Sequence, residues 1–275
     1  MKRTLLIRNA NSGSAGALDE GQLSEGLRKA GFDPVRSVEL PDADLPKRAD
    51  VERDNIEVIA IVSGDGTISS VCAEMSGWDG ALLVLPGGTM NLLSRRLHGE
   101  LDLAAVLEKL AAAETLSGPV PVIKLADREI LTGLTAGPST EWGKVREGIR
   151  QGDVGDLVEK VPEAWTETIS GEGVRVKGDD NDYPSIFVAP FDASNLAVTG
   201  FKAEGIKDML AHGVAWLKGD FREGPRDDLG KMPELVIAAK GRHIGLLVDG
   251  EQEDGQSPLS CHAGMSSVNF VRMVE

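Results

Sequence analysis

The sequence predicts an α/β protein whose first part is a doubly wound parallel sheet and whose second part is a β-rich sandwich. Up to about residue 118, short apolar runs alternate with helix-like segments, which is typical of parallel strands joined by helical crossovers. From residue 119 onward, most apolar runs are short and separated by turn residues, which favours a β-rich fold. We therefore expect an α/β domain at 1–118 and a β-rich domain at 119–267.

Each predicted element rests on its apolar pattern. The first part has strands at 4–8, 34–40, 57–62 and 81–85, with helical segments at 17–30, 67–76, 89–98 and 101–113. The second part has strands within 119–134 and at 185–190, 195–200, 233–239 and 243–250. The tripeptide "KGR" at 240–242 predicts a hairpin turn. The segment 203–219 predicts a helix packed on the core, or alternatively a gate to a binding site.

The overall charge disfavours some partners. With 29 Lys and Arg against 44 Asp and Glu, the formal net charge is −15. This charge opposes non-specific adsorption to nucleic acid, so we expect no nucleic-acid partner. Two isolated cysteines, Cys72 and Cys261, match neither a disulfide framework nor a zinc site. The N-terminus does not resemble a signal peptide and the apolar runs are too short to span a membrane, so we expect a cytoplasmic protein.

Three of the four predicted early strands run directly into glycine-containing loops. These loops are "NANSGSAG" (9–16), "SGDGT" (63–67) and "PGGTMN" (86–91). Because the carboxyl ends of parallel strands lie on one edge of the sheet, the loops can meet at a single crevice. Glycine allows close approach of backbone N–H groups, and a following helix adds further donors, so the three loops together predict a phosphate site. Alternatively, each glycine is an ordinary strand end and Thr67 or Thr89 is a helix N-cap.

Asp65 distinguishes this pattern from a simple anion site. A carboxylate beside a polyphosphate is repulsive unless a cation lies between them or the carboxylate takes part in proton transfer. A magnesium nucleotide supplies the cation and a phosphoryl acceptor supplies the proton. The loop therefore favours phosphoryl transfer. The common phosphate motifs are absent. "GPSTEWGK" (137–144) has one residue too many for a Walker A loop, and "GSAG" lacks the third glycine and the acidic residue of the dinucleotide fingerprint.

These residues resemble a known family. "SGDGT" is similar to the Gly-Gly-Asp-Gly-Thr signature shared by diacylglycerol kinases, sphingosine kinases, NAD kinases and 6-phosphofructokinases. "NANSG" (9–13), "LPGGTMNLLSRRL" (85–97) and "LLVDGEQ" (246–252) resemble three further elements of the lipid-kinase branch, in the same order. The chain is therefore identified as a member of the diacylglycerol kinase catalytic family.

The resemblance implies ATP- and Mg²⁺-dependent transfer of the γ-phosphate to the hydroxyl of a diacylglycerol-like or sphingoid-like lipid. It also implies that the last strand, within about 268–275, returns to the first domain. It is compatible with a homodimer and with transient contact with a membrane surface. The residues that would hold the nucleotide are Asn9, Ser12, Gly13, Ser63, Gly64, Asp65, Gly66, Thr67, Gly88, Thr89 and Asn91.

Three carboxylates are candidates for the catalytic base. The resemblance assigns Asp249 or Glu251 to accept the proton of the lipid hydroxyl. Asp65 is a rival base and also the candidate metal contact, through the Mg²⁺ of the nucleotide. The sequence does not decide which of the three carboxylates is the base. From the residues alone, Asp249 and Glu251 indicate only a polar turn after a strand.

Two departures from the family pattern leave an alternative open. Leu92 follows Asn91 where the family usually has aspartate, and "APFDASNLAV" offers Asp192 without the Asp-Gly that holds a structural Mg²⁺. A weakly catalytic or regulatory homologue is therefore the second hypothesis, and a soluble-metabolite kinase of the NAD type is the third. In "LSRRLHG" (93–99), Arg95, Arg96 and His98 are either solvated charge or a source of one arginine near the γ-phosphate.

Overall fold

The computed structural model describes residues 1–9, 19–137, 173–202 and 226–274. The chain divides into two compact units. The first unit comprises Met1–Val120 together with Met265–Glu275, and the second comprises Pro121–Gly264.

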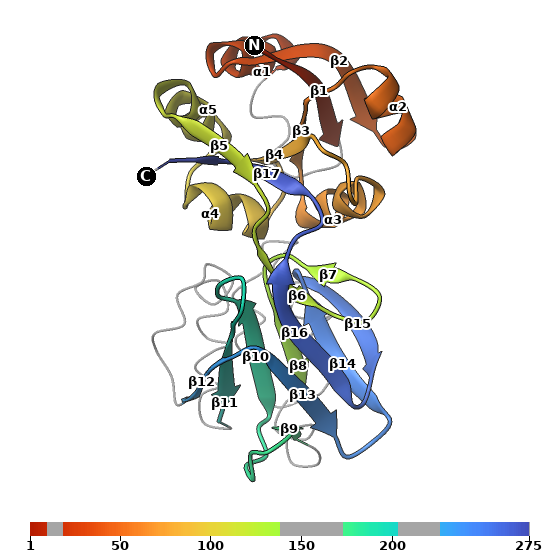
Figure 1. The fold of residues 1–275 in the computed structure, drawn as a ribbon, viewed down its shortest axis with the longest axis vertical. Helices are drawn as coiled ribbons and strands as arrows, with labels where there is room; N and C mark the ends of the chain where they lie inside the picture. Colours follow the sequence, from red (N-terminus) through yellow and green to blue (C-terminus); the bar gives the residue numbers. More distant parts are fainter. Residues whose placement is uncertain (10–18, 138–172, 203–225, 275) are drawn as a thin grey trace, which may run out of the picture. The chain divides into compact units, whose positions relative to one another are not determined.

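The first unit contains a six-stranded sheet in the order β2-β1-β3-β4-β17-β5 (Figure 1). Its strands are β1 (Lys2–Asn9), β2 (Phe32–Leu40), β3 (Val58–Ser63), β4 (Ala81–Pro86), β5 (Thr115–Gly118) and β17 (Asn269–Met273). All pairs are parallel except β17 with β5, which is antiparallel. All six residues of β3 and of β4 are buried, as expected for central strands of a sheet covered on both faces.

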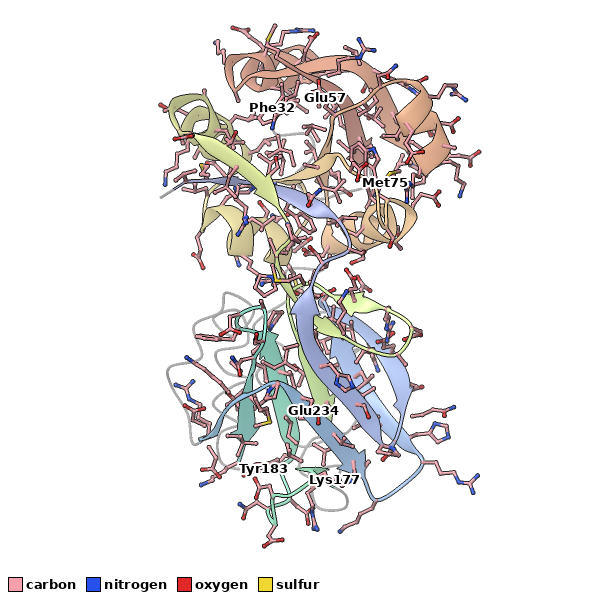
Figure 2. The ribbon with its side chains drawn as sticks, viewed as in Figure 1. Phe32, Glu57, Met75, Lys177, Tyr183 and Glu234 are labelled. Atoms are coloured by element: carbon pink, nitrogen blue, oxygen red, sulfur yellow. The ribbon has the colours of Figure 1, made fainter. Side chains whose placement is uncertain are left out.

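Helices cover both faces of this sheet. They are α1 (Glu20–Lys29), α2 (Arg48–Arg53), α3 (Asp65–Glu74), α4 (Leu92–His98) and α5 (Leu103–Ala112). Figure 1 shows α1 and α5 on one side of the sheet and α3 and α4 on the other. Apolar side chains of α1 and α5 share one core cluster with Phe32 and with alternate residues of β3 and β4. Phe32 and Met75, labelled in Figure 2, are among the fully buried side chains of this unit.

The second unit is a sandwich of two sheets. The first has the order β12-β11-β10-β8-β14-β15 and the second the order β7-β6-β16-β13-β9. Their strands are β6 (Pro121–Lys124), β7 (Glu129–Ile130), β8 (Leu134–Gly137), β9 (Val174–Val176), β10 (Ser185–Pro190), β11 (Leu196–Phe201), β12 (Arg226–Met232), β13 (Glu234–Ala239), β14 (His243–Val248), β15 (Glu251–Gln256) and β16 (Leu259–Met265). Side chains from both sheets form a single buried cluster that includes Tyr183 (Figure 2).

The predicted fold class is confirmed, and several details are corrected. The prediction of a hairpin at "KGR" is wrong, because β13 pairs with β16 and β9 whereas β14 pairs with β15 and β8. The tripeptide therefore joins the two sheets. The helix predicted at 67–76 begins at Asp65 and the one predicted at 89–98 begins at Leu92. Their N-caps are Gly64 and Asn91, so the N-cap interpretation of Thr67 and Thr89 is also wrong.

Some predictions fall on residues that the structure does not describe. Ser12 and Gly13 lie within 10–18, the predicted helix lies within 203–225, and the segment 137–144 is described only at Gly137. Among the described residues, no helix has the length and apolar character needed to span a membrane.

Candidate functional site

The three glycine loops of the first unit follow β1, β3 and β4 at the carboxyl edge of its sheet. Asn9, the last residue of β1, donates from Nδ2 to Thr67 Oγ1 in α3 at 3.1 Å. This hydrogen bond connects the first loop to the second. Neighbouring strands β3 and β4 end in register, with Ser63 opposite Pro86, so the second and third loops also begin side by side.

The second and third loops contact each other through their glycine backbones. A Cβ atom added to Gly88 would lie 2.5 Å from Gly64 Cα, and one added to Gly87 would lie 2.5 Å from Ser63 N. Both distances are far shorter than real Cβ contacts, and the atoms involved belong to the backbone. Glycine at 87 and 88 is therefore required by the approach of one loop to the other.

Asn91 organises the third loop from within. It has a left-handed backbone with φ 51°, and its Oδ1 accepts from Gly87 N at 3.1 Å and Gly88 N at 2.7 Å. Its Nδ2 donates to Gly88 O at 2.9 Å. The side chain that the resemblance assigns to the nucleotide thus makes three hydrogen bonds within its own loop.

Asp65 connects the second loop to the helix after the third. Its Oδ2 accepts from Leu92 N and its Oδ1 accepts from Leu93 N, both at 3.1 Å. These two N–H groups belong to the first turn of α4, where helix donors lack partners in the helix itself. The N-cap residue of α4, Asn91, makes no capping bond with its own side chain. Asp65 therefore caps α4 from a neighbouring helix.

The N-terminus of α3 differs from that of α4 in its capping residue. Gly64 is its N-cap and supplies no side-chain acceptor, and its first turn contains Asp65, Gly66 and Thr67. Gly66 and Thr89 are exposed. A ten-residue helix that begins in a glycine loop, at the carboxyl edge of a parallel sheet, suits an anionic phosphate group. The described residues of this loop cluster therefore fit the triphosphate that the resemblance implies.

Asp249 and Gly250 form the turn between β14 and β15 in the second unit. Val248 pairs with Glu251, so the connection has two residues, and both have positive φ, 48° and 85°. This is the form of a type I′ hairpin turn, for which Asp-Gly is a preferred sequence. The polar-turn interpretation of this pair thus has a structural basis.

The Asp249 side chain is buried and points back onto the loop between β7 and β8. Its Oδ1 accepts from Thr132 N at 2.6 Å, Thr132 Oγ1 at 2.7 Å and Gly133 N at 3.3 Å, and its Oδ2 accepts from Leu131 N at 3.0 Å. Its exposed fraction is 8%. The carboxylate is therefore held by three backbone donors and one hydroxyl, with more room for a further donor at Oδ2 than at Oδ1.

Thr132 was not identified from the sequence. The signal available there was a hydroxyl residue before Gly133 in "EILTGL", which by itself only indicates a turn. Gly133 is required because an added Cβ would lie 2.8 Å from the Phe187 ring. Neither residue lies near Asp249 in the sequence, so its hydrogen-bond partners could not be read from the motif.

Glu251, the other carboxylate of the motif, begins β15 and is exposed. Further along β15, Glu253 accepts hydrogen bonds from both terminal nitrogens of Arg128. The bonds to Glu253 are the main reason that the pKa of Arg128 is raised. This ion pair ties β15 to the segment just before β7, next to the loop that holds Asp249.

Asp192 was considered above as part of a structural metal site. Its carboxylate accepts from Ser194 N at 2.8 Å and from Asn195 Nδ2 at 3.1 and 3.2 Å. The bond from Ser194 is the largest cause of its lowered pKa. The described part of the chain contains no group of three or more His, Cys, Asp or Glu side chains that could hold a metal ion. Asp192 therefore organises a tight turn.

The basic segment of α4 separates into two kinds of residue. Arg95 and Arg96 are partly exposed, whereas His98 is buried. His98 Nε2 donates to Val84 O at 3.0 Å, and burial lowers its pKa. His98 is therefore a core residue and does not add positive charge to the surface.

Comparison with known families places this loop cluster within a matched domain. Residues 3–122 match the diacylglycerol kinase catalytic domain, and this stretch contains all three glycine loops. Residues 3–122 belong to the diacylglycerol kinase catalytic-domain family. The predicted family is thus confirmed for the part of the chain that carries the glycine loops. Asp249 and Glu251 lie outside the matched residues of the diacylglycerol kinase domain.

A curated relative points to the same family. The chain is 29% identical over 114 residues to a protein named "Putative lipid kinase" from Streptococcus pneumoniae serotype 4 (strain ATCC BAA-334 / TIGR4). The match covers 40% of this chain and 39% of the length of that relative. This similarity therefore concerns less than half of either protein.

Two solved structures share the fold over nearly the whole chain. A "putative diacylglycerol kinase" from Bacillus anthracis str. Sterne has 18% sequence identity and a TM-score of 0.62, covering 98% of this chain and 94% of that one. A second structure of a diacylglycerol kinase from the same organism has 15% identity and a TM-score of 0.55, covering 98% and 96%. At these identities the similarity shows the fold, an α/β unit followed by a β-rich unit.

Proposed function

We propose that this protein is an ATP-dependent lipid kinase that phosphorylates the hydroxyl of a diacylglycerol-like or sphingoid-like lipid. The observation that supports the proposal is the contact between the second and third glycine loops, with Asn9 bonded to Thr67, at the carboxyl edge of a parallel sheet. These residues lie in a stretch that matches the diacylglycerol kinase catalytic domain. The acceptor class comes from the family and from the name of the curated relative.

The nucleotide phosphates are assigned to the first turn of α3. Its N-cap supplies no side-chain acceptor, and Asn9 and Thr67 lie beside it. The α4 N-terminus is a poorer candidate because its Leu92 and Leu93 N–H groups already donate to Asp65. Mg²⁺ that arrives bound to the nucleotide would neutralise part of the charge of the triphosphate.

The proposed reaction transfers one phosphoryl group. The lipid hydroxyl oxygen forms a bond to the γ-phosphorus, the bond from the γ-phosphorus to the β,γ-bridging oxygen breaks, and ADP leaves. The hydroxyl proton passes to a carboxylate, which we assign to Asp249 or Glu251. Asp249 has a fixed orientation, whereas Glu251 is the more exposed of the two.

An assay of the full chain tests this function. Purified protein is incubated with labelled ATP, Mg²⁺ and a panel of diacylglycerol, sphingoid base and NAD. We expect the wild type to produce a labelled lipid. Of the two variants Asp249→Asn and Glu251→Gln, the one that removes the base should lower kcat by about 10²-fold or more. Asparagine is a suitable replacement at 249 because it tolerates positive φ. Label in NAD would instead identify a soluble-metabolite kinase.

A nucleotide- or lipid-binding homologue without turnover is the second candidate. It is favoured by the engagement of the Asp249 carboxylate with four donors and by Leu92 at a position where the family usually has aspartate. ATP binding without transfer to any acceptor, and unchanged by Asp249→Asn, would support this candidate and count against the kinase.

A further inference from the structure

We infer that Asp65 is a positioning residue, which fixes the third glycine loop against the nucleotide-binding turn by capping α4. This inference rests on the proposed nucleotide site. It differs from the two roles considered for Asp65 in the sequence, a proton acceptor and a contact of the nucleotide Mg²⁺. In those roles the carboxylate would act on the bound nucleotide or the acceptor, whereas here it acts through the protein backbone.

The hydrogen bonds of Asp65 support this role. Each carboxylate oxygen accepts one backbone N–H of α4, from Leu92 and Leu93, at 3.1 Å. Both bonds are partly buried, and they join residues 27 and 28 positions apart in the sequence. A carboxylate that caps a helix N-terminus also interacts favourably with the helix dipole.

The cap explains how the negatively charged Asp65 side chain can stand at the start of α3, beside the proposed phosphate site. An isolated carboxylate beside a triphosphate would repel it. Here the two oxygens face the positive end of α4, which offsets part of that charge without a metal ion.

The cap has a structural consequence for the third loop. Asn91 precedes the two capped residues, and its side chain holds Gly87 and Gly88 in place. Gly88 in turn touches Gly64, the N-cap of α3. Asp65 thus closes a ring of contacts from α3 to α4, through the third loop and back to α3. Breaking the cap should loosen the surface on which the phosphates lie.

Asp102 provides a matched control in the same unit. It is the N-cap of α5, and its Oδ1 accepts from Ala105 N at 2.8 Å. It caps its own helix and belongs to none of the three loops. Asp65→Ala and Asp102→Ala therefore each remove a helix cap, but only the first removes a contact between the nucleotide loops. Asp65→Asn keeps one acceptor oxygen and serves as a milder variant.

The test measures ATP affinity by calorimetry with Mg²⁺ and with EDTA, together with the melting temperature and the lipid-kinase turnover of each variant. We expect Asp65→Ala to weaken ATP binding by about tenfold, because the substitution leaves two backbone donors of α4 without their acceptor. The factor should be the same with and without Mg²⁺. Asp65→Asn should give a smaller loss. Asp102→Ala should lower the melting temperature without changing ATP affinity.

Four results would overturn the inference. A loss of affinity confined to the Mg²⁺ condition would make Asp65 a metal contact. An unchanged affinity in Asp65→Ala with turnover abolished would make it the base, and no change in either would leave it without the inferred role. If wild type shows the expected binding pattern but phosphorylates no lipid, the inference stands and the lipid-kinase proposal fails. No ATP binding by wild type would overturn both.

Discussion

The carboxylates of Asp65 and Asp249, two residues in motifs that resemble those of lipid kinases, are both bound by the protein itself. Asp65 accepts two backbone N–H groups of α4, and Asp249 accepts three from the loop between β7 and β8. Each belongs to a different unit. Backbone hydrogen bonds therefore fix the orientation of both carboxylates.

The Nδ1 atom of His98 is buried without a hydrogen-bond partner among the described residues. Its Nε2 must carry the proton, since Val84 O can only accept. Burial lowers the pKa of His98 below its usual value of 6.5. Between that lowered pKa and about 6.5, the unfolded chain binds a proton that the folded chain does not, so stability rises with pH in this window.

We therefore predict that the free energy of unfolding decreases as pH falls below about 6.5, by up to about 1.4 kcal/mol per pH unit from this residue. His98→Gln should reduce this slope, because glutamine can keep a donor near Val84 O and does not titrate. Denaturant unfolding of both proteins from pH 5 to 8 measures the effect. Identical slopes in wild type and variant would show that another group controls the acid sensitivity.

At the scale of elements, the two glycine loops after β3 and β4 form one packed structure. The position of each loop followed from its strand, because runs such as "ALLVLP" are apolar without interruption and end at glycine. The hairpin predicted at "KGR" failed for the opposite reason. A turn between two strands has the same local residues whether the strands pair with each other or enter different sheets, and partners elsewhere decided the outcome.

We predict that Gly88→Ala destabilises the first unit by about 1–3 kcal/mol, the usual cost of overpacking. The added Cβ would meet the Gly64 backbone at 2.5 Å, and a backbone cannot move aside as a flexible side chain can. Gly118→Ala in β5 is the control, since its nearest atom would be a side-chain nitrogen of Arg272 at 3.7 Å. Equal stability of the two variants in urea would show that the loop contact is looser than the structure indicates.

At the scale of the whole molecule, the net charge of −15 matters for a protein proposed to act on lipids. An anionic surface repels such a chain over a distance set by ionic strength, about 30 Å at 0.01 M and about 10 Å at 0.1 M. Contact with a bilayer would therefore depend on a local feature and not on overall attraction.

We predict that the protein binds vesicles of phosphatidylcholine better than vesicles that also contain about 30% phosphatidylglycerol, when both are measured at low salt. The difference should shrink as salt is raised to about 0.5 M, because the repulsion is screened. Co-sedimentation at two salt concentrations measures it. Tighter binding to the anionic vesicles at low salt would reveal a basic surface that outweighs the net charge.

The fold class, the family of residues 3–122 and the places where the glycine loops begin could all be predicted from the sequence. Those properties depend on local patterns, since hydrophobic period reports the type of element and glycine motifs report strand ends. Three interactions could be seen only in the folded protein: Asp65 caps α4, Asn91 organises its own loop and Thr132 holds Asp249. Asp65 and Asp249 find their partners 27 and 117 residues away, and the choice of such partners depends on how whole elements pack.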